Sequence, residues 1–190
     1  GVIPPLFVDL DGTLIRTDLL HEAALVLFKR SPWRLLRALA TLVHGRAAFK
    51  RAISEAVSPE IRQLPFREEV LEFVAEQRSL GRKVILATAA DSAWAQSIAH
   101  ELGTFDAVLA SDGSRNRKGA AKLEAIQAYC REHGYTEFDY LADSRADLPI
   151  WREARGVCLV APFGRLLRKV REFAEPATIL GTRKVPTRLW

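Results

Sequence analysis

Short, continuous apolar runs give the first structural signal in this chain. Aliphatic and β-branched side chains gather in five segments, at 6–10, 83–89, 107–111, 138–142 and 156–161. Continuous rather than alternating runs are typical of strands that are covered on both faces, as in a parallel sheet. Helical patterns lie between most of these runs, and a glycine follows each pattern, at 66–80, 92–102, 118–133 and 146–155. The alternation predicts an α/β fold with a doubly wound, Rossmann-like parallel sheet of about five strands.

One interval is much longer than a single crossover helix needs. Between the first two runs, apolar positions recur at helical spacing in three segments, at 19–28, 33–43 and 47–57. We therefore predict a helical insertion at 18–65 above the carboxyl edge of the sheet. The core then comprises 1–17 and 66–175, and 176–190, with two prolines and a glycine, is a C-terminal arm or linker. Asp91 is a candidate N-cap for the helix at 92–102.

Composition narrows the class of protein. Of the 190 residues, 48% are hydrophobic and 27% charged, which excludes a disordered chain. No apolar stretch approaches the roughly 20 residues that cross a bilayer. Cys130 and Cys158 have no paired spacing, so neither a disulfide framework nor a zinc cluster is expected, and a reducing, cytoplasmic setting is the default.

The basic excess is uneven. The formal net charge is +5, and the lysines and arginines are concentrated at 29–51, at 114–122 and at 165–188. Solubility explains such segments, and so does a surface for anionic partners such as phosphates or lipid headgroups. The segment 31–51 resembles an interfacial amphipathic helix, which would bring the protein to the cytoplasmic face of a membrane. The alternative is a helix that packs its apolar face on the core. No nucleic-acid-binding motif accompanies the basic segments.

Acidic and hydroxyl residues follow the predicted strands. Asp9 and Asp11 end the first, Thr88 the second and Asp143 the fourth, with Asp147 just beyond. Ligands of open parallel sheets bind outside the carboxyl ends of the strands, so these residues should converge. Carboxylates so close together raise one another's pKa, and a hard cation such as Mg²⁺ relieves the repulsion. The placement predicts a metal and phosphate site.

Four separated motifs now resemble the haloacid dehalogenase-like superfamily. They are FVDLDGT at the first strand, LAT at the second, RNRKGAAK, and LADSRADLPIW at the fourth. The resemblance covers residues 4–162 and keeps the family's order. A narrower similarity, carried by VDLDGTLIRTDLL, ASDGSRNRKGAAK and ADLPIW, is to the domains that precede UbiA-like membrane prenyltransferases. Contact with a fused membrane domain or with a membrane surface is therefore an open expectation.

The resemblance implies a role for each residue of the first motif. Asp9 is the expected nucleophile, which forms an aspartyl-phosphate. Asp11 is the expected general acid and base, and its main-chain carbonyl would join Asp9 in binding Mg²⁺. Dehalogenases of the superfamily lack the second carboxylate, so Asp11 favours phosphoryl transfer. Gly12 permits the tight turn, and Thr13 holds it.

The other motifs supply phosphate and metal contacts by the same resemblance. Thr88 would bind a phosphate oxygen, although a threonine at a strand end can also cap the next helix. Lys122 is favoured over Lys118 as the catalytic cation. Asp143 is the expected third metal ligand. Supporting roles around the metal and phosphate fall to Ser144 and Asp147.

The insertion corresponds to the family's C1 cap. Its residues nearest the nucleophile, Arg16, Asp18 and His21, are candidates for substrate specificity. The expected activity is Mg²⁺-dependent phosphatase action on a phosphorylated small molecule, including phosphosugars or prenyl-linked phosphosugars. Two alternatives stay open: a phosphotransferase, and a catalytically silent docking domain of a membrane prenyltransferase. Nucleic acid is not an expected partner, and the oligomeric state is not predicted.

Overall fold

A parallel sheet forms the centre of the molecule in a computed structural model, which describes residues 1–57, 60–111 and 119–181. Within these residues six strands pair in the order β3-β2-β1-β4-β5-β6, and every pairing is parallel. The strands are β1 (Leu6–Val8), β2 (Val84–Asp91), β3 (Ala107–Ser111), β4 (Asp139–Ala142), β5 (Gly156–Val160) and β6 (Thr178–Leu180). The α/β parallel-sheet prediction is confirmed.

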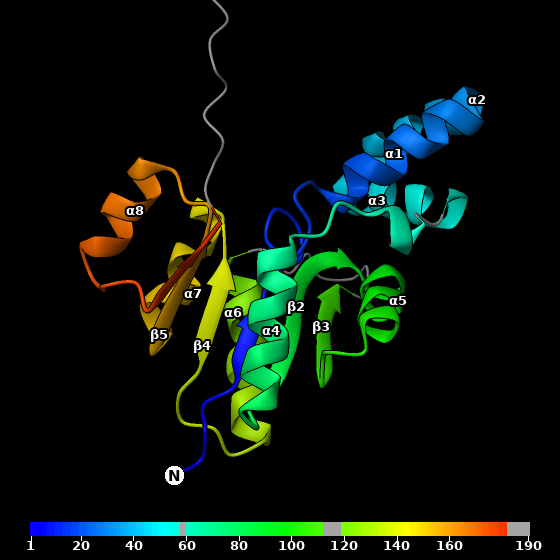
Figure 1. Cartoon of the computed structure of the whole chain (residues 1–190). Helices are drawn as coiled ribbons and strands as arrows, with labels where there is room; N and C mark the ends of the chain where they lie inside the picture. The colour runs from blue at the N-terminus through cyan, green and yellow to red at the C-terminus, as the bar shows by residue number, and fades with distance from the viewer. Residues whose placement is uncertain (58–59, 112–118, 182–190) are drawn as a thin grey trace, which may run out of the picture.

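Helices cover both faces of this sheet (Figure 1). One apolar core contains residues of α4 (Glu68–Ser79) and α5 (Ser92–Leu102). The second core contains residues of α6 (Ala120–Glu132), α7 (Leu148–Glu153) and α8 (Gly164–Arg171). The predicted N-cap is confirmed, since the Asp91 carboxylate accepts hydrogen bonds from the first turn of α5.

Strand β1 shows why its sequence is apolar without alternation. Leu6 and Val8 lie in the first core, and Phe7 between them lies in the second. All three are fully buried, because a central strand presents consecutive side chains to opposite, covered faces. The neighbours of β1 are β2 and β4, so the loops after β1 and β4 are adjacent at the carboxyl edge of the sheet.

The long interval between β1 and β2 is helical, as predicted. It contains α1 (Leu19–Arg30), α2 (Pro32–Ala40) and α3 (Arg46–Ala56), with short 3₁₀ turns at Thr41–His44 and Ile61–Gln63. These helices form a projection beyond the carboxyl edge of the sheet (Figure 1). The side chain of Asp18 begins α1 by accepting from the backbone nitrogens of Leu20 and His21. No helix of the described residues is long and apolar enough to cross a bilayer.

The prediction of about five strands missed β6. Residues 178–180 were expected in a C-terminal arm, but they pair with β5 at the edge of the sheet. An edge strand of three residues, with Ile179 exposed, lacks the continuous apolar run that revealed the inner strands. Helix α8 was also not predicted. It buries only Leu166 and Val170, and the arginines and lysine around them leave too few apolar positions to give a helical pattern.

A buried ion pair stabilises the amino edge of the sheet, where the strands begin. Asp139, at the start of β4, receives hydrogen bonds from Arg155 Nε at 3.0 Å and Nη2 at 2.9 Å, and another from Arg82. Arg82 also donates to the carbonyl of Pro4 at 2.7 Å. Gly156 leaves room for this carboxylate, since a methyl group there would collide with it. Burial acts to raise the pKa of Asp139, but the two arginines lower it overall.

Asp139→Asn should lower the free energy of unfolding by about 3 kcal/mol at neutral pH, because buried Arg82 loses its counterion. A pKa depressed in the folded state stabilises the fold above the unfolded pKa, and this contribution is lost as pH falls through the folded value. The difference between variant and wild type should therefore shrink below about pH 3.9. Urea titrations across pH measure it.

Asp106→Asn provides the matched control. Asp106 pairs with exposed Lys83 at 3.1 Å, and an asparagine can still accept the bond from the backbone nitrogen of Val84 at 2.9 Å, so the substitution should cost less than about 1 kcal/mol. Equal losses in the two variants, or a difference for Asp139→Asn that does not change with pH, would contradict the role given to Asp139.

Candidate active site

Asp9 lies where β1 ends and a tight turn begins. Its backbone nitrogen donates to the carbonyl of Leu141 in β4 at 3.0 Å, which ties the turn to the neighbouring strand. Its carboxylate is buried, and Oδ1 accepts from the backbone nitrogen of Leu10 at 2.9 Å. The turn continues through Gly12, whose φ of 75° suits glycine. The strand end therefore fixes the direction of the Asp9 side chain.

The ammonium group of Lys122, from the first turn of α6, lies beside Asp9 below the protein surface. Its Nζ is 2.9 Å from Asp9 Oδ1, 3.2 Å from Asp147 Oδ1 and 3.1 Å from the hydroxyl of Tyr140. These three contacts use the three donors of the ammonium. Burial acts to lower the pKa of Lys122, but Asp9 and Asp147 raise it overall, so the side chain stays charged.

Asp143 follows β4 and lies against the first motif. Its Oδ1 accepts from Thr13 Oγ1 at 3.1 Å. Gly12 permits this approach, because a methyl group at that position would collide with the Asp143 carboxylate. Burial raises the pKa of Asp143, and the bond from Thr13 opposes the rise. The turn after β1 and the loop after β4 are thus packed closely together.

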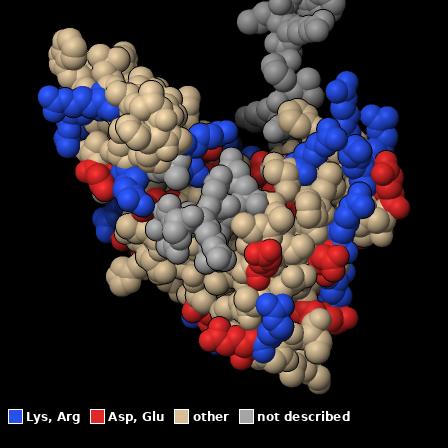
Figure 2. Space-filling model, turned by 180° about the vertical axis from the view of Figure 1, so that it is seen from behind, with Lys and Arg blue, Asp and Glu red and all other residues tan. Residues whose placement is uncertain are grey.

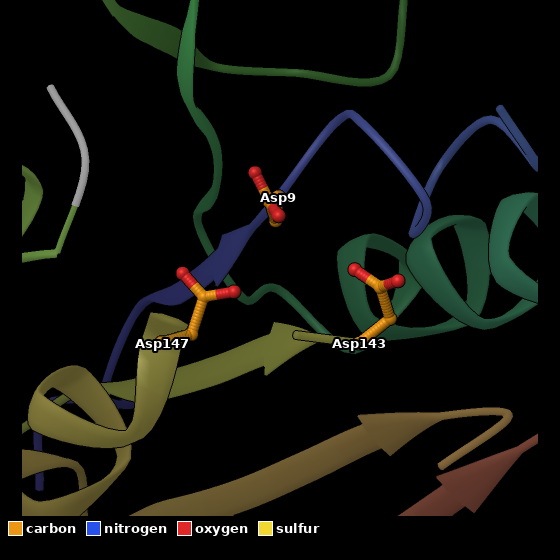
Figure 3. Close-up of side chains that lie close together, drawn as sticks. All are labelled: Asp9, Asp143 and Asp147. Carbon is orange, nitrogen blue, oxygen red and sulfur yellow. The ribbon is translucent and has the colours of Figure 1, made fainter. Parts of the chain in front are cut away.

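Three carboxylates converge here. Asp9, Asp143 and Asp147 each offer an oxygen, and these oxygens lie within 4.8 Å of one another (Figure 3). Oxygen ligands at such separations suit a hard divalent cation. Burial raises the pKa of Asp9 to about 7, which Lys122 opposes and Asp147 reinforces. A bound cation would favour the ionised form, so the donor set fits Mg²⁺.

Asp11 lies outside this cluster. Its carboxylate accepts from the backbone nitrogen of Leu19 at 2.9 Å, at the start of α1. Burial raises its pKa to about 6, and the charge of Asp18 adds to the rise. Asp11 therefore connects the turn after β1 to the inserted helices, and it holds a proton more readily than an exposed aspartate. Its main-chain carbonyl stays a predicted metal ligand.

The carboxylates open onto a cavity of about 330 Å³. The turn after β1, the loop after β4 and the start of α6 all contribute to its lining. Arg16 and Asp18, at the entrance to the insertion, also line it. Acidic groups, a buried ammonium and an arginine therefore surround one space large enough for a small phosphorylated molecule.

A family model described as haloacid dehalogenase-like hydrolase matches residues 6–152. The chain belongs to this family. A curated relative, the uncharacterised protein y4nM of Sinorhizobium fredii, is 41% identical over 187 residues. That alignment covers 98% of this chain and 36% of y4nM, so the chain spans little more than a third of its relative.

Solved structures share the hydrolase fold. A Bordetella pertussis protein of unknown function has a TM-score of 0.70 at 16% identity, covering 95% of this chain and 99% of its own. A phospho-aspartyl intermediate analogue of phosphoserine phosphatase has a TM-score of 0.64 at 15% identity, covering 95% and 94%. A Streptococcus pneumoniae protein of the haloacid dehalogenase-like family has a TM-score of 0.62 at 18% identity, covering 94% and 93%.

Only one of the remaining predicted residues, Ser144, lines the cavity among the described residues. Ser144 also caps the following 3₁₀ turn, Arg145–Asp147. Thr88 is fully buried, and its hydroxyl accepts from the backbone nitrogen of Ala90 at 3.0 Å. His21 is exposed on α1. Lys118, the alternative to Lys122, lies outside the described residues.

Three residues that were not predicted contact this site or the backbone that lines it. Tyr140 donates to Asp147 Oδ1 at 2.9 Å, which completes the buried group around Lys122. Lys50, from α3, donates to the carbonyl of Ala89 at 3.2 Å. Arg67 donates to the carbonyl of Gly12 at 3.3 Å. Only Tyr140 gave a usable signal, since a phenol inside a buried strand needs a hydrogen-bond partner.

Gly12→Ala should destabilise the fold more than Gly134→Ala. Both glycines have positive φ, 75° and 72°, so each substitution carries a backbone strain of about 1 kcal/mol. The new methyl group meets the Asp143 carboxylate only at Gly12, whereas Gly134 has nothing within 4 Å. Overpacking should add about 1–3 kcal/mol to the loss at Gly12. Urea titrations compare the variants, and equal losses would contradict the close packing of Gly12 and Asp143.

Proposed function

We propose that this chain is a Mg²⁺-dependent phosphatase that hydrolyses phosphate monoesters through a phosphorylated Asp9. One observation carries the proposal. The buried Asp9 carboxylate lies 2.9 Å from the Lys122 ammonium and shares a 4.8 Å cluster with Asp143 at the edge of a cavity. A nucleophile, a fixed positive charge and metal ligands in one place are what phosphoryl transfer requires.

Two half-reactions follow from this arrangement. Both hydrogen bonds to the Asp9 carboxylate among the described residues go to Oδ1, so Oδ2 is the oxygen that attacks phosphorus. An oxygen–phosphorus bond forms on Asp9 while the bond from phosphorus to the alcohol breaks. Water then attacks the same phosphorus, which releases inorganic phosphate and restores the carboxylate. Lys122 offsets negative charge in both steps.

Asp11 is the general acid and base of both half-reactions. In the first half-reaction its protonated carboxyl donates to the departing alkoxide, and in the second its carboxylate takes a proton from the attacking water. The raised pKa of Asp11, caused first by burial, keeps the acid form accessible near neutral pH. Its bond from Leu19 would link this proton transfer to the position of the inserted helices.

Mg²⁺ would be held by Asp9 and Asp143, with the main-chain carbonyl of Asp11 as a third ligand. The ion supplies positive charge that orients the phosphate and makes phosphorus easier to attack. Asp147 supports the site in another way, because its Oδ1 already receives Lys122 at 3.2 Å and Tyr140 at 2.9 Å. Thr13 orients Asp143.

The inserted helices at 18–65 would serve as the cap. Such a lid excludes water and contacts the part of the substrate other than phosphate. Arg16 and Asp18 line the cavity and are the residues that would contact this part. The substrate class is a phosphorylated small molecule, and phosphosugars, free or prenyl-linked, belong in a first panel. The likeness to phosphoserine phosphatase structures supports the phosphatase assignment through the shared fold.

Asp9→Asn should reduce phosphate release from aryl phosphates by roughly 10³-fold or more in the presence of Mg²⁺, because the amide cannot attack phosphorus. Asp106→Asn, at the opposite edge of the sheet, should keep wild-type rates. Equal rates in wild type and Asp9→Asn would refute the enzymatic proposal. Adding an alcohol acceptor distinguishes hydrolysis from transfer, since a transferase would form a new phosphate ester.

Asp11→Asn should slow catalysis by about 10²–10⁴-fold, with the loss depending on the leaving group. Alkyl phosphates, whose alkoxides need a proton, should lose the most activity. Dinitrophenyl phosphate, whose phenolate leaves unprotonated, should lose much less in the first step. Burst kinetics separate phosphorylation of the enzyme from its hydrolysis. A loss independent of the leaving group in the burst phase would contradict general-acid catalysis by Asp11.

A further inference from the structure

The inserted helices carry an apolar surface on their outer side. Seven large apolar side chains within 25–43 are exposed, and Trp33 and Val43 are 75% and 84% accessible. We name these seven the insertion-tip surface: Leu25, Phe28, Trp33, Leu36, Leu39, Leu42 and Val43. Isolated exposed apolar residues are ordinary, but a concentration of this kind on one projection marks an interaction site.

None of these seven residues belongs to the apolar core that the insertion shares with the sheet. Helix α2 turns Leu35 and Ala38 toward the apolar core that the insertion shares with the sheet. Trp33 and Leu36, three positions apart, share a different side of the same helix and are exposed. The inner stripe already anchors α2, so the outer stripe is free to bind something else.

The charge around this surface is of one sign. Between Glu22 and Glu55 the sequence has no acidic residue and seven lysines and arginines. Lys29 and Arg30 end α1, and Arg34 and Arg37 alternate with the apolar residues of α2; all four are exposed. Figure 2 shows blue side chains beside a tan surface on this projection. A partner must therefore accept apolar side chains and supply negative charge within one turn of helix.

We propose that the insertion-tip surface docks on an anionic lipid bilayer. Interfacial helices sink their apolar side chains to the boundary of the acyl chains while basic side chains contact the headgroups. The segment between Glu22 and Glu55, with seven basic residues and no acidic one, complements the negative surface of a bilayer of anionic lipids.

Vesicle sedimentation tests the proposal on the 190-residue chain. The wild type should sediment with vesicles of phosphatidylcholine and phosphatidylglycerol and stay in solution with phosphatidylcholine alone. Trp33→Ser combined with Leu36→Ser, and separately Arg34→Gln combined with Arg37→Gln, should each lower the bound fraction at least tenfold. Added salt should weaken binding, because surface attraction is screened. These positions are exposed, so thermal unfolding should not change.

Arg165→Gln combined with Arg168→Gln is the matched control. It removes the same charge from exposed positions of α8 and should leave vesicle binding unchanged. An equal loss in this control would mean general charge attraction and would overturn the proposal, as would wild type that stays in solution with anionic vesicles. A dimer that Trp33→Ser dissociates, without vesicle binding, would assign the surface to a second copy instead.

The proposal is independent of catalysis. Asp9→Asn should bind anionic vesicles as tightly as wild type, so failure of the phosphatase assignment would leave this result in place. If Asp9→Asn failed to bind anionic vesicles, docking through the insertion would be overturned, because Asp9 is buried at the end of β1 and cannot contact lipid.

Discussion

The ammonium of Lys122 is the group on which the candidate site depends. It lies between two buried carboxylates, Asp9 and Asp147, at 2.9 and 3.2 Å. Buried carboxylates without a counterion would take up protons. Burial raises the pKa of Asp9 despite the nearby ammonium, so Lys122 offsets only part of the free-energy cost of burying this charge. The remaining deficit of positive charge is why we propose that a divalent cation binds here, which would in turn attract a phosphate group. Burial is therefore the main cause of the raised pKa of Asp9, and the neighbouring acids add less.

The two ends of the strands differ in their role: the amino edge of the sheet carries a stabilising ion pair, and the carboxyl edge carries the candidate site. At the amino edge of β4, Asp139 is fully matched by Arg82 and Arg155, and its pKa is lowered overall. At the carboxyl edge, Asp143 follows the same strand with a hydroxyl partner, and its pKa is raised. Two aspartates at the ends of one strand of four residues thus differ because one has cationic partners and the other faces a cavity. The matched end stabilises the fold, and the unmatched end is available for a ligand.

The sequence predicted the inner strands and the converging acids for a physical reason. Buried strands such as β1 must be apolar on both faces, and parallel connections bring Asp9 and Asp143 to one edge. The sixth strand escaped prediction because an edge strand needs no apolar run, and α8 because basic residues dominate it. The contacts of Tyr140 and Lys50 also escaped, since both depend on how distant elements pack. The choice between Lys122 and Lys118 rested on spacing alone, whereas the contact of Lys122 with Asp9 is a property of the fold. The association with a membrane prenyltransferase stays a prediction from the motif resemblance.

A crystal of the chain, grown with magnesium and soaked with beryllium fluoride, tests whether Asp9 is the group that becomes phosphorylated. Beryllium fluoride mimics a phosphoryl group attached to a carboxylate. We expect an adduct on Oδ2 of Asp9, with Lys122 beside it and a cation held by Asp9 and Asp143. An adduct on another carboxylate, or an Asp9 that stays unmodified in a cavity open to solvent, would contradict it.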